Sequence, residues 1–374
     1  MSYRKIILIL CLGIFLSAER NVNAQIVQTF SYTGTFQTFT VPSCVTLITV
    51  NCSGGQGGGV NSDSGGRGAR MIGAISVVPG EVLTVLVGKA GVGTSNGGSA
   101  GGGGGGSFVM HGATPLIIAG GGGGRRDTGP AGNLPNTNGY KGQHGQNSYD
   151  NTGAGGAPGN GGTSGEPNGG GTGGPGGGLN TNGGPDGSAG GGPGLSYSNG
   201  ATPGPGCTSG SDIGGAGGFG GGGGGTFCYR GTAGGGGGYS GGGTGVNDAG
   251  AGGGGSYEVA GTIDTINTTG GAAPGNGIVI FKYSTDSVGN GSTHVISEVT
   301  CTGGSNGKAC AILTGGAYPT YTYSWSPGGQ TRDTATGLSA GLYTVIVTGC
   351  GSATTTVTIT QPTAICLTLM VRMA

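Results

Sequence analysis

Short runs of β-branched and aromatic residues recur along the first third of the chain, and Gly or Pro separates them. The runs are residues 36–42, 44–52, 69–78, 81–88, 107–110 and 115–120. One further run of the same kind, GIVIFKY (277–283), follows the glycine-rich centre. Short strands between turn residues are typical of an all-β protein and favour a β-sandwich. The last run is predicted to close the sandwich that the first begins, so residues 25–119 and 257–284 form one domain.

A second alternating pattern lies towards the C-terminus, in YTYSWSP (321–327), GLYTVIVTG (341–349) and TTTVTITQP (354–362). In the first of these segments Tyr321, Tyr323 and Trp325 fall on one face of an extended chain. The pattern predicts a second β domain over residues 294–361, which a linker at 285–293 joins to the first. The tail at 362–374 continues no such pattern, and either a native end or a truncated or frameshifted reading frame accounts for it.

The insertion at 120–256 is dominated by glycine, which supplies 103 of the 374 residues. Collagen needs glycine at every third position, and residues 161–184 do not keep that period. Disordered chains usually carry many charges, whereas this chain has only 14 basic and 14 acidic residues. The choice therefore lies between a flexible tether and an ordered glycine structure.

Glycine runs occur at residues 101–106, 120–124, 220–225, 234–238 and 252–255, and aromatic residues stand near several of them: Phe108, Phe219, Tyr239 and Tyr257. A left-handed polyproline-II-type helix has three residues per turn and makes no internal hydrogen bonds. Its N–H and C=O groups must find partners in neighbouring segments, and glycine lets such segments come close. We therefore predict a packed bundle of polyglycine-II helices.

The N-terminus has the pattern of a secretory signal peptide over residues 1–24. Arg4 and Lys5 precede the apolar run 6–16, and Val22-Asn23-Ala24 has the small residues of a cleavage site. The apolar run is too short to span a bilayer, and no other segment is long and apolar enough. We expect an exported protein that is extracellular or at the cell surface. A net charge of zero gives no electrostatic reason to bind nucleic acid.

Eight of the nine cysteines remain after residue 24, an even number that suggests disulfides in an exported chain. Cys207 and Cys228 flank a glycine run, and a bond between them would add about 3 kcal/mol in the chain-entropy description. Cys44 and Cys52 would stand roughly 26 Å apart in an extended chain, so they cannot bond to each other unless it bends. Spacing assigns no partner to these two, nor to Cys310 and Cys366.

No arrangement of catalytic residues is evident, and we expect neither enzymatic activity nor a cofactor or metal. His111, His144 and His294 have no metal-ligand partner at a suitable spacing. Arg125, Arg126 and Asp127, at the exit of a glycine run, form a candidate polar recognition loop for an anionic ligand, with a solvated charge pair as the alternative.

Four blocks in order, FTVPSCVTLITVNCSGGQGGG, TPLIIAGGGGGRR, GGFGGGGGGTFCYRGTAGGGGGYSGGG and GNGIVIFKY, resemble the glycine-rich extracellular domain of the anaplastic lymphoma kinase and leukocyte tyrosine kinase receptors. The resemblance covers residues 28–284. It implies a tumour-necrosis-factor-like β-sandwich that carries polyglycine helices, with Cys207 and Cys228 where that family also has cysteines. It does not imply a kinase, because the chain has no DFG or HRD motif.

The motifs VTC (299–301), YSWS (323–326), GLSAGLYTVIVT (337–348) and ITQP (359–362) resemble the SprB-type repeat of bacterial surface proteins, over residues 294–361. This resemblance implies a small immunoglobulin-like β-sandwich in a cell-surface adhesin. Cys301 and Cys350 fall at the two usual cysteine positions of the repeat, while Cys310 is additional.

The two resemblances and the export signal predict a non-enzymatic adhesion or recognition protein of a bacterium. Its partner would be an unknown cell-surface protein or glycan. Two alternatives stay open: a structural matrix or coat component that associates with itself, and an ectodomain-like fragment that resembles the receptor glycine-rich domain.

Overall fold

The computed structural model describes residues 25–61, 63–95, 99–126, 136–165, 172–185, 190–209, 212–226, 231–246, 250–263, 265–285, 290–314 and 321–363. The chain divides into two compact units, Gln25–Thr285 and a second that begins at Asp286. Regular structure in this part of the chain consists of β-strands and one short 3-10 helix, η1 (Tyr197–Asn199). None of the helices described is long and apolar enough to cross a membrane.

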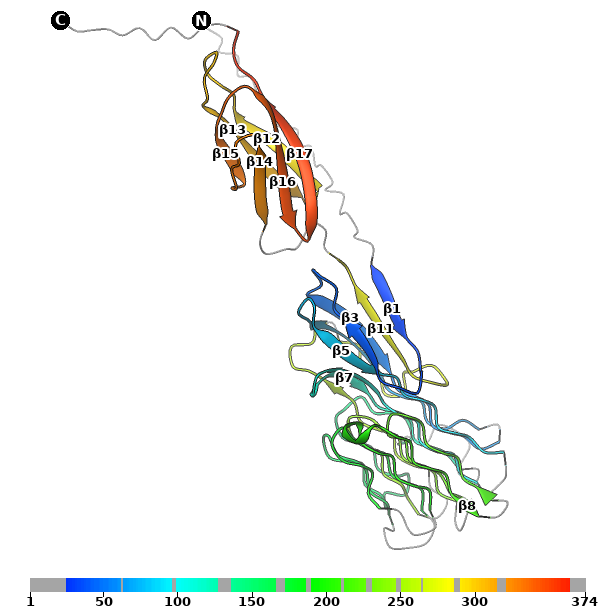
Figure 1. Cartoon of the computed structure of the whole chain (residues 1–374). Helices are drawn as coiled ribbons and strands as arrows, with labels where there is room; N and C mark the ends of the chain where they lie inside the picture. Colours follow the sequence, from blue (N-terminus) through cyan, green and yellow to red (C-terminus); the bar gives the residue numbers. More distant parts are fainter. Residues whose placement is uncertain are drawn as a thin grey trace, which may run out of the picture. The chain divides into compact units, whose positions relative to one another are not determined.

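Two antiparallel sheets form the sandwich of the first unit (Figure 1). One sheet has the order β1 (Ile26–Phe30), β11 (Ile278–Tyr283), β3 (Leu47–Ser53), β4 (Arg70–Ser76). The other has the order β10 (Tyr257–Glu258), β7 (Thr114–Ala119), β6 (Ser107–His111), β5 (Val82–Leu86), β2 (Gln37–Thr40).

The seven predicted strand segments all correspond to strands, with ends that differ by a few residues. The segment 277–283 becomes β11, which lies between β1 and β3 and so joins the end of the unit to its beginning. The strand β1 was not predicted, because IVQTF directly follows the signal-like segment and lacks a turn residue before it.

A single core lies between the two sheets, because alternate side chains of each strand point inward. Its members include Phe30, Val50, Ile75 and Phe281 from one sheet and Leu83, Val85, Val109 and Ile117 from the other. Phe281 makes edge contacts with the rings of Phe30 and Phe39 at centroid distances of 5.2 and 5.0 Å. Buried apolar area of this kind, at about 25 cal/mol per Å², is the main stabilisation of such a sandwich.

The other face of the five-stranded sheet is also covered. Leu86, Phe108, Met110 and Ile118 alternate with the core residues along β5, β6 and β7, and they pack with Leu179 and Ala201 of the glycine-rich region. Three of the aromatic residues near glycine runs, Phe219, Tyr239 and Tyr257, border this second cluster. The glycine-rich region therefore supplies the apolar layer that a solvent-facing sheet would lack.

The glycine segments continue from the ends of the strands as extended chains that donate hydrogen bonds to one another. Residues 101–106 show the pattern: the first and fourth N–H groups donate to 122–125, the second and fifth to 89–92, and the third and sixth to 220–223. The six donor–acceptor distances lie between 2.7 and 3.1 Å. A period of three differs from the period of two in a β-strand, so these segments are not sheet.

The boundary of this hydrogen-bonded glycine bundle differs from the predicted one at residue 120. Segments 54–59, 65–69, 88–93 and 100–106, which belong to loops of the sandwich, take part in the same network. The predicted domain bounds placed all four in the sandwich, although the run 101–106 was counted among the glycine runs of the bundle. The bundle is thus built by the strand connections as well as by the long insertion.

Neighbouring glycine segments lie closer than any side chain permits. A Cβ on Gly122 would lie 1.9 Å from the carbonyl oxygen of Gly66, and one on Gly103 would lie 2.0 Å from that of Gly235. Backbone atoms fill the space that a side chain would need, so these positions require glycine.

The second unit is a small sandwich of two three-stranded antiparallel sheets. One sheet has the order β12 (Asn290–Ser297), β13 (Gly307–Thr314), β15 (Thr334–Leu338), and the other β14 (Thr322–Ser326), β16 (Gly341–Gly349), β17 (Gly351–Ile359). Trp325 is buried in the core and its indole N–H donates to the carbonyl of Arg332 at 2.9 Å. The predicted shared face of Tyr321, Tyr323 and Trp325 is confirmed by their packing against this core.

We predict that Gly122→Ala lowers the free energy of unfolding of the first unit by about 1–3 kcal/mol, the usual cost of overpacking. The matched control is Gly184→Ala, because a Cβ there would stay 3.3 Å from the nearest atom, the carbonyl oxygen of Gly162. Amide hydrogen exchange by mass spectrometry is the measurement. Equal protection of the bundle in both variants would contradict the close packing.

The two free thiols among the described cysteines should differ in reactivity. Burial raises the pKa of Cys52 to about 12, and its thiol donates to the carbonyl of Ser107 at 3.5 Å, whereas Cys310 is half-buried. An alkylating reagent at pH 9 should modify Cys310 and leave Cys52 intact until the protein is unfolded. The raised pKa also means that stability falls as the pH rises above 9, because the unfolded thiol then loses its proton first. Mass spectrometry of the labelled peptides decides the matter, and prompt labelling of Cys52 in the folded chain would contradict its burial.

Candidate functional site

Two residues of the candidate recognition loop at the exit of the 120–124 run, Arg125 and Arg126, are described by the structure, and neither is fully exposed. Arg125 is buried, with its side chain 8% exposed, and its Nη2 lies 3.1 Å from Oδ2 of Asp63. Arg126 is half-buried, and its backbone forms an isolated antiparallel β-bridge with that of Ala100. Asp127 lies outside the described residues. Arg125 therefore anchors a distant loop to the bundle.

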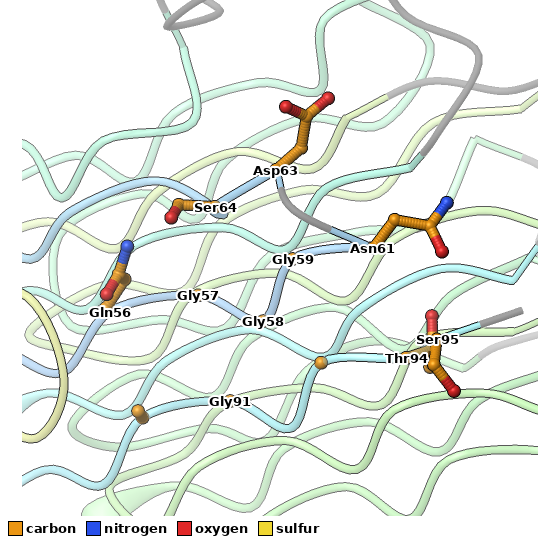
Figure 2. A pocket seen from close by; sticks show the side chains of 12 residues that line it. Gln56, Gly57, Gly58, Gly59, Asn61, Asp63, Ser64, Gly91, Thr94 and Ser95 are labelled. Carbon is orange, nitrogen blue, oxygen red and sulfur yellow. The ribbon is translucent and has the colours of Figure 1, made fainter.

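Beside this ion pair, the surface of the bundle is hollowed into a groove of about 470 Å³. Figure 2 shows Gln56 at one end, Thr94 and Ser95 at the other, and the glycine backbone between them. The residues that line the groove are Gln56, Gly57, Gly58, Gly59, Asn61, Asp63, Ser64, Ala90, Gly91, Gly93, Thr94 and Ser95.

Two extended segments, 56–61 and 91–94, form the floor of the groove. The N–H of Gly91 donates to the carbonyl of Gln56 at 2.8 Å, and three residues further the N–H of Thr94 donates to the carbonyl of Gly59 at 3.0 Å. In the opposite direction, the N–H of Asn61 donates to the carbonyl of Thr94 at 2.9 Å. These bonds on both strands hold the floor in a defined register.

Apart from Ala90, the side chains around the groove are polar, and the one that carries a charge, Asp63, is paired with Arg125. Among the residues that the structure describes, the hydroxyl of Thr94 has no hydrogen-bond partner although it is buried. Asn61 and Ser64 are exposed. The lining therefore offers donors and acceptors without net charge, a chemistry suited to a neutral polar ligand.

Sequence inspection missed this groove and Asp63. The groove is made by two connections of the sandwich that are far apart in sequence, and its floor is backbone, which carries no residue signature. Of the residues at this site, only Arg125 had a signal in the sequence, namely its position directly after a glycine run. Its partner came from the connection that follows β3.

The cysteines take different states in the described part of the chain. Cys207, Cys301 and Cys350, three of the predicted disulfide cysteines, are disulfide-bonded, and so is Cys44. Cys52 is a free buried thiol, so it is not joined to Cys44, as the strand geometry had indicated. Cys228 and Cys366 lie outside the described residues.

No group of three or more His, Cys, Asp or Glu side chains that could hold a metal occurs among the described residues. His111 lies 3.7 Å from Glu81, and His294 stands opposite Cys310 on adjacent strands β12 and β13. His144 is exposed on the glycine region.

We expect Asp63→Asn to lower the free energy of unfolding by about 1–3 kcal/mol, because it takes the carboxylate away from a buried guanidinium. Amide exchange of the segments 57–60 and 122–125 measures the local effect. Asp333→Asn, at an exposed carboxylate of the second unit, is the control. Unchanged protection at 122–125 would mean that the ion pair does not anchor the loop.

Comparison with known proteins gives one partial match. A family model described as the SprB repeat matches residues 293–330, which include β13, β14 and most of β12. No curated protein matches the chain. The second unit is thus similar to a SprB repeat, and this similarity suggests a bacterial surface protein of the adhesin type.

Proposed function

We propose that this chain is a non-enzymatic adhesion or recognition protein, exported and exposed at a bacterial cell surface. The observation that carries the proposal is the SprB repeat match at 293–330, which falls on a small sandwich with its own core around Trp325. The signal-like pattern of residues 1–24 is consistent with export. In this proposal the second unit is a module of a surface stalk, and the first unit presents the recognition surface.

The finer architecture of the first unit is part of the proposal. The period of three in the hydrogen bonds of segment 101–106 supports polyglycine-II helices, since that helix has three residues per turn. Two sheets around one core support a tumour-necrosis-factor-like sandwich of the kind that the receptor resemblance implies. A bundle held by backbone hydrogen bonds gives a firm, uncharged base on which connecting loops can vary without disturbing it.

Two measurements test the proposal. Antibodies against the full chain should label intact cells of the bacterium that produces it, and external protease should remove the label. Beads coated with the full chain should be retained under flow on some of a panel of cell, glycan and protein surfaces, whereas beads coated with albumin should not. Labelling that requires lysis of the cells, or retention on none of the surfaces, would refute the proposal.

A further inference from the structure

A short piece of the chain, 275–277, runs along one edge of the bundle next to the groove. The N–H of Gln56 donates to the carbonyl of Gly275 at 2.9 Å, and the N–H of Gly277 donates to the carbonyl of Gly88 at 2.8 Å. The N–H of Ala90 donates to the side-chain oxygen of Asn276 at 2.9 Å. Three backbone groups of the edge are therefore satisfied by this piece of chain.

The same three groups recur one turn further along the edge, where no described residue bonds to them. Three residues beyond Gln56, Gly88 and Ala90 stand Gly59, Gly91 and Gly93. Within the described part of the chain, the N–H of Gly59, the C=O of Gly91 and the N–H of Gly93 make no hydrogen bond. All three residues line the groove and are partly or fully exposed.

The chain's own segment turns away before it reaches these groups. Ala272 donates its N–H to the carbonyl of Gly68 at 3.1 Å, so the residues before Gly275 leave the edge. The groove lies in line with the path that residues 275–277 follow. With a period of three, the open groups repeat the arrangement that already holds a chain.

We propose that this groove binds an extended, uncharged, glycine-rich segment of another polypeptide, in line with residues 275–277. The bound segment would donate to the carbonyl of Gly91 and accept from the N–H groups of Gly59 and Gly93. This is the equivalent, for a bundle with three residues per turn, of adding a strand to the edge of a sheet. The site rests on the proposed recognition role and names its partner class.

The groove selects against bulky and charged partners. On the existing path, a Cβ at Gly277, which donates to the edge, would lie 2.3 Å from the carbonyl oxygen of Ser53, whereas one at Gly275 would meet nothing within 4 Å. A chain held in the same way must therefore have glycine at the position that donates to the edge. The one carboxylate of the groove is paired with Arg125, and burying an unpaired charge beside it is unfavourable. Asn61 and Ser64, which are exposed, supply polar groups for the outer side of the bound segment.

The test titrates the full chain into a fluorescein-labelled peptide of Gly-Gly-Ser repeats and follows fluorescence anisotropy. We expect saturable binding, and Ser64→Trp, which fills the groove from an exposed position, should weaken it by about tenfold or more. The matched control is Ser352→Trp, at an exposed serine of β17, which should leave binding unchanged. A peptide with alanine in place of glycine should not bind, and neither should a proline peptide, which has ring atoms in place of hydrogen and no N–H donors.

Amide exchange confirms that each variant keeps the bundle, and Ser95→Trp replaces Ser64→Trp if the latter unfolds. Equal binding by wild type and the filled variant, or no saturable binding by the folded wild type, would overturn the proposal, as would binding of maltohexaose at the groove in place of the peptide. Concentration-dependent assembly of the full chain that Ser64→Trp abolishes would support the site, with a second copy as the source of the segment. If the peptide binds but the coated beads are not retained, only the adhesion role is refuted. If the peptide does not bind and Ser64→Trp leaves the retention of the beads unchanged, only the groove is refuted.

Discussion

The hydrogen bond between backbones that carry no side chain is the interaction on which the first unit depends. Each such bond contributes only about 0.5–1.5 kcal/mol, while fixing each glycine costs about 1–2 kcal/mol of conformational entropy. The glycine segments therefore cannot hold together by hydrogen bonds alone. They are held because several of them, such as 101–106 and 120–124, continue strands of the sandwich, which fixes their direction and register. In addition, the cluster around Phe108 and Tyr239 attaches the glycine-rich region to the five-stranded sheet.

This arrangement explains why so few charged residues are needed. Many glycines lie so close to a neighbouring segment that an added Cβ would come within about 2 Å of its backbone, so there is no room for side chains. The backbone N–H groups donate to the carbonyls of neighbouring segments. Where a charge is buried, as at Arg125, it has a carboxylate opposite. Where the network reaches the surface, as in the groove, backbone groups themselves become the recognition chemistry.

The sequence allowed seven strands of the first unit to be predicted, because alternation of apolar residues and Gly or Pro turns is local. It also allowed Tyr321, Tyr323 and Trp325 to be placed on one face, which packs against the core of the second unit. It did not allow the extent of the bundle to be predicted, since the loop glycines at 54–59 and 88–93 have the same composition as ordinary turns. The groove could not be predicted for a related reason. Which carbonyl accepts from which N–H depends on the register between distant segments, and a run of identical glycines carries no information about that register.

The position of β11 in the middle of its sheet has a kinetic consequence. This strand, at residues 278–283, separates β1 from β3, so that neither can complete its hydrogen bonds before the last strand of the unit exists. Segment 101–106 likewise needs 220–223 as a partner. Contacts between residues so far apart in sequence make folding slow, because a long loop has to close before any of them forms. A chain synthesised from its amino end would therefore lack the inner strand of this sheet until residue 283 is available, and β1 would have no partner until then.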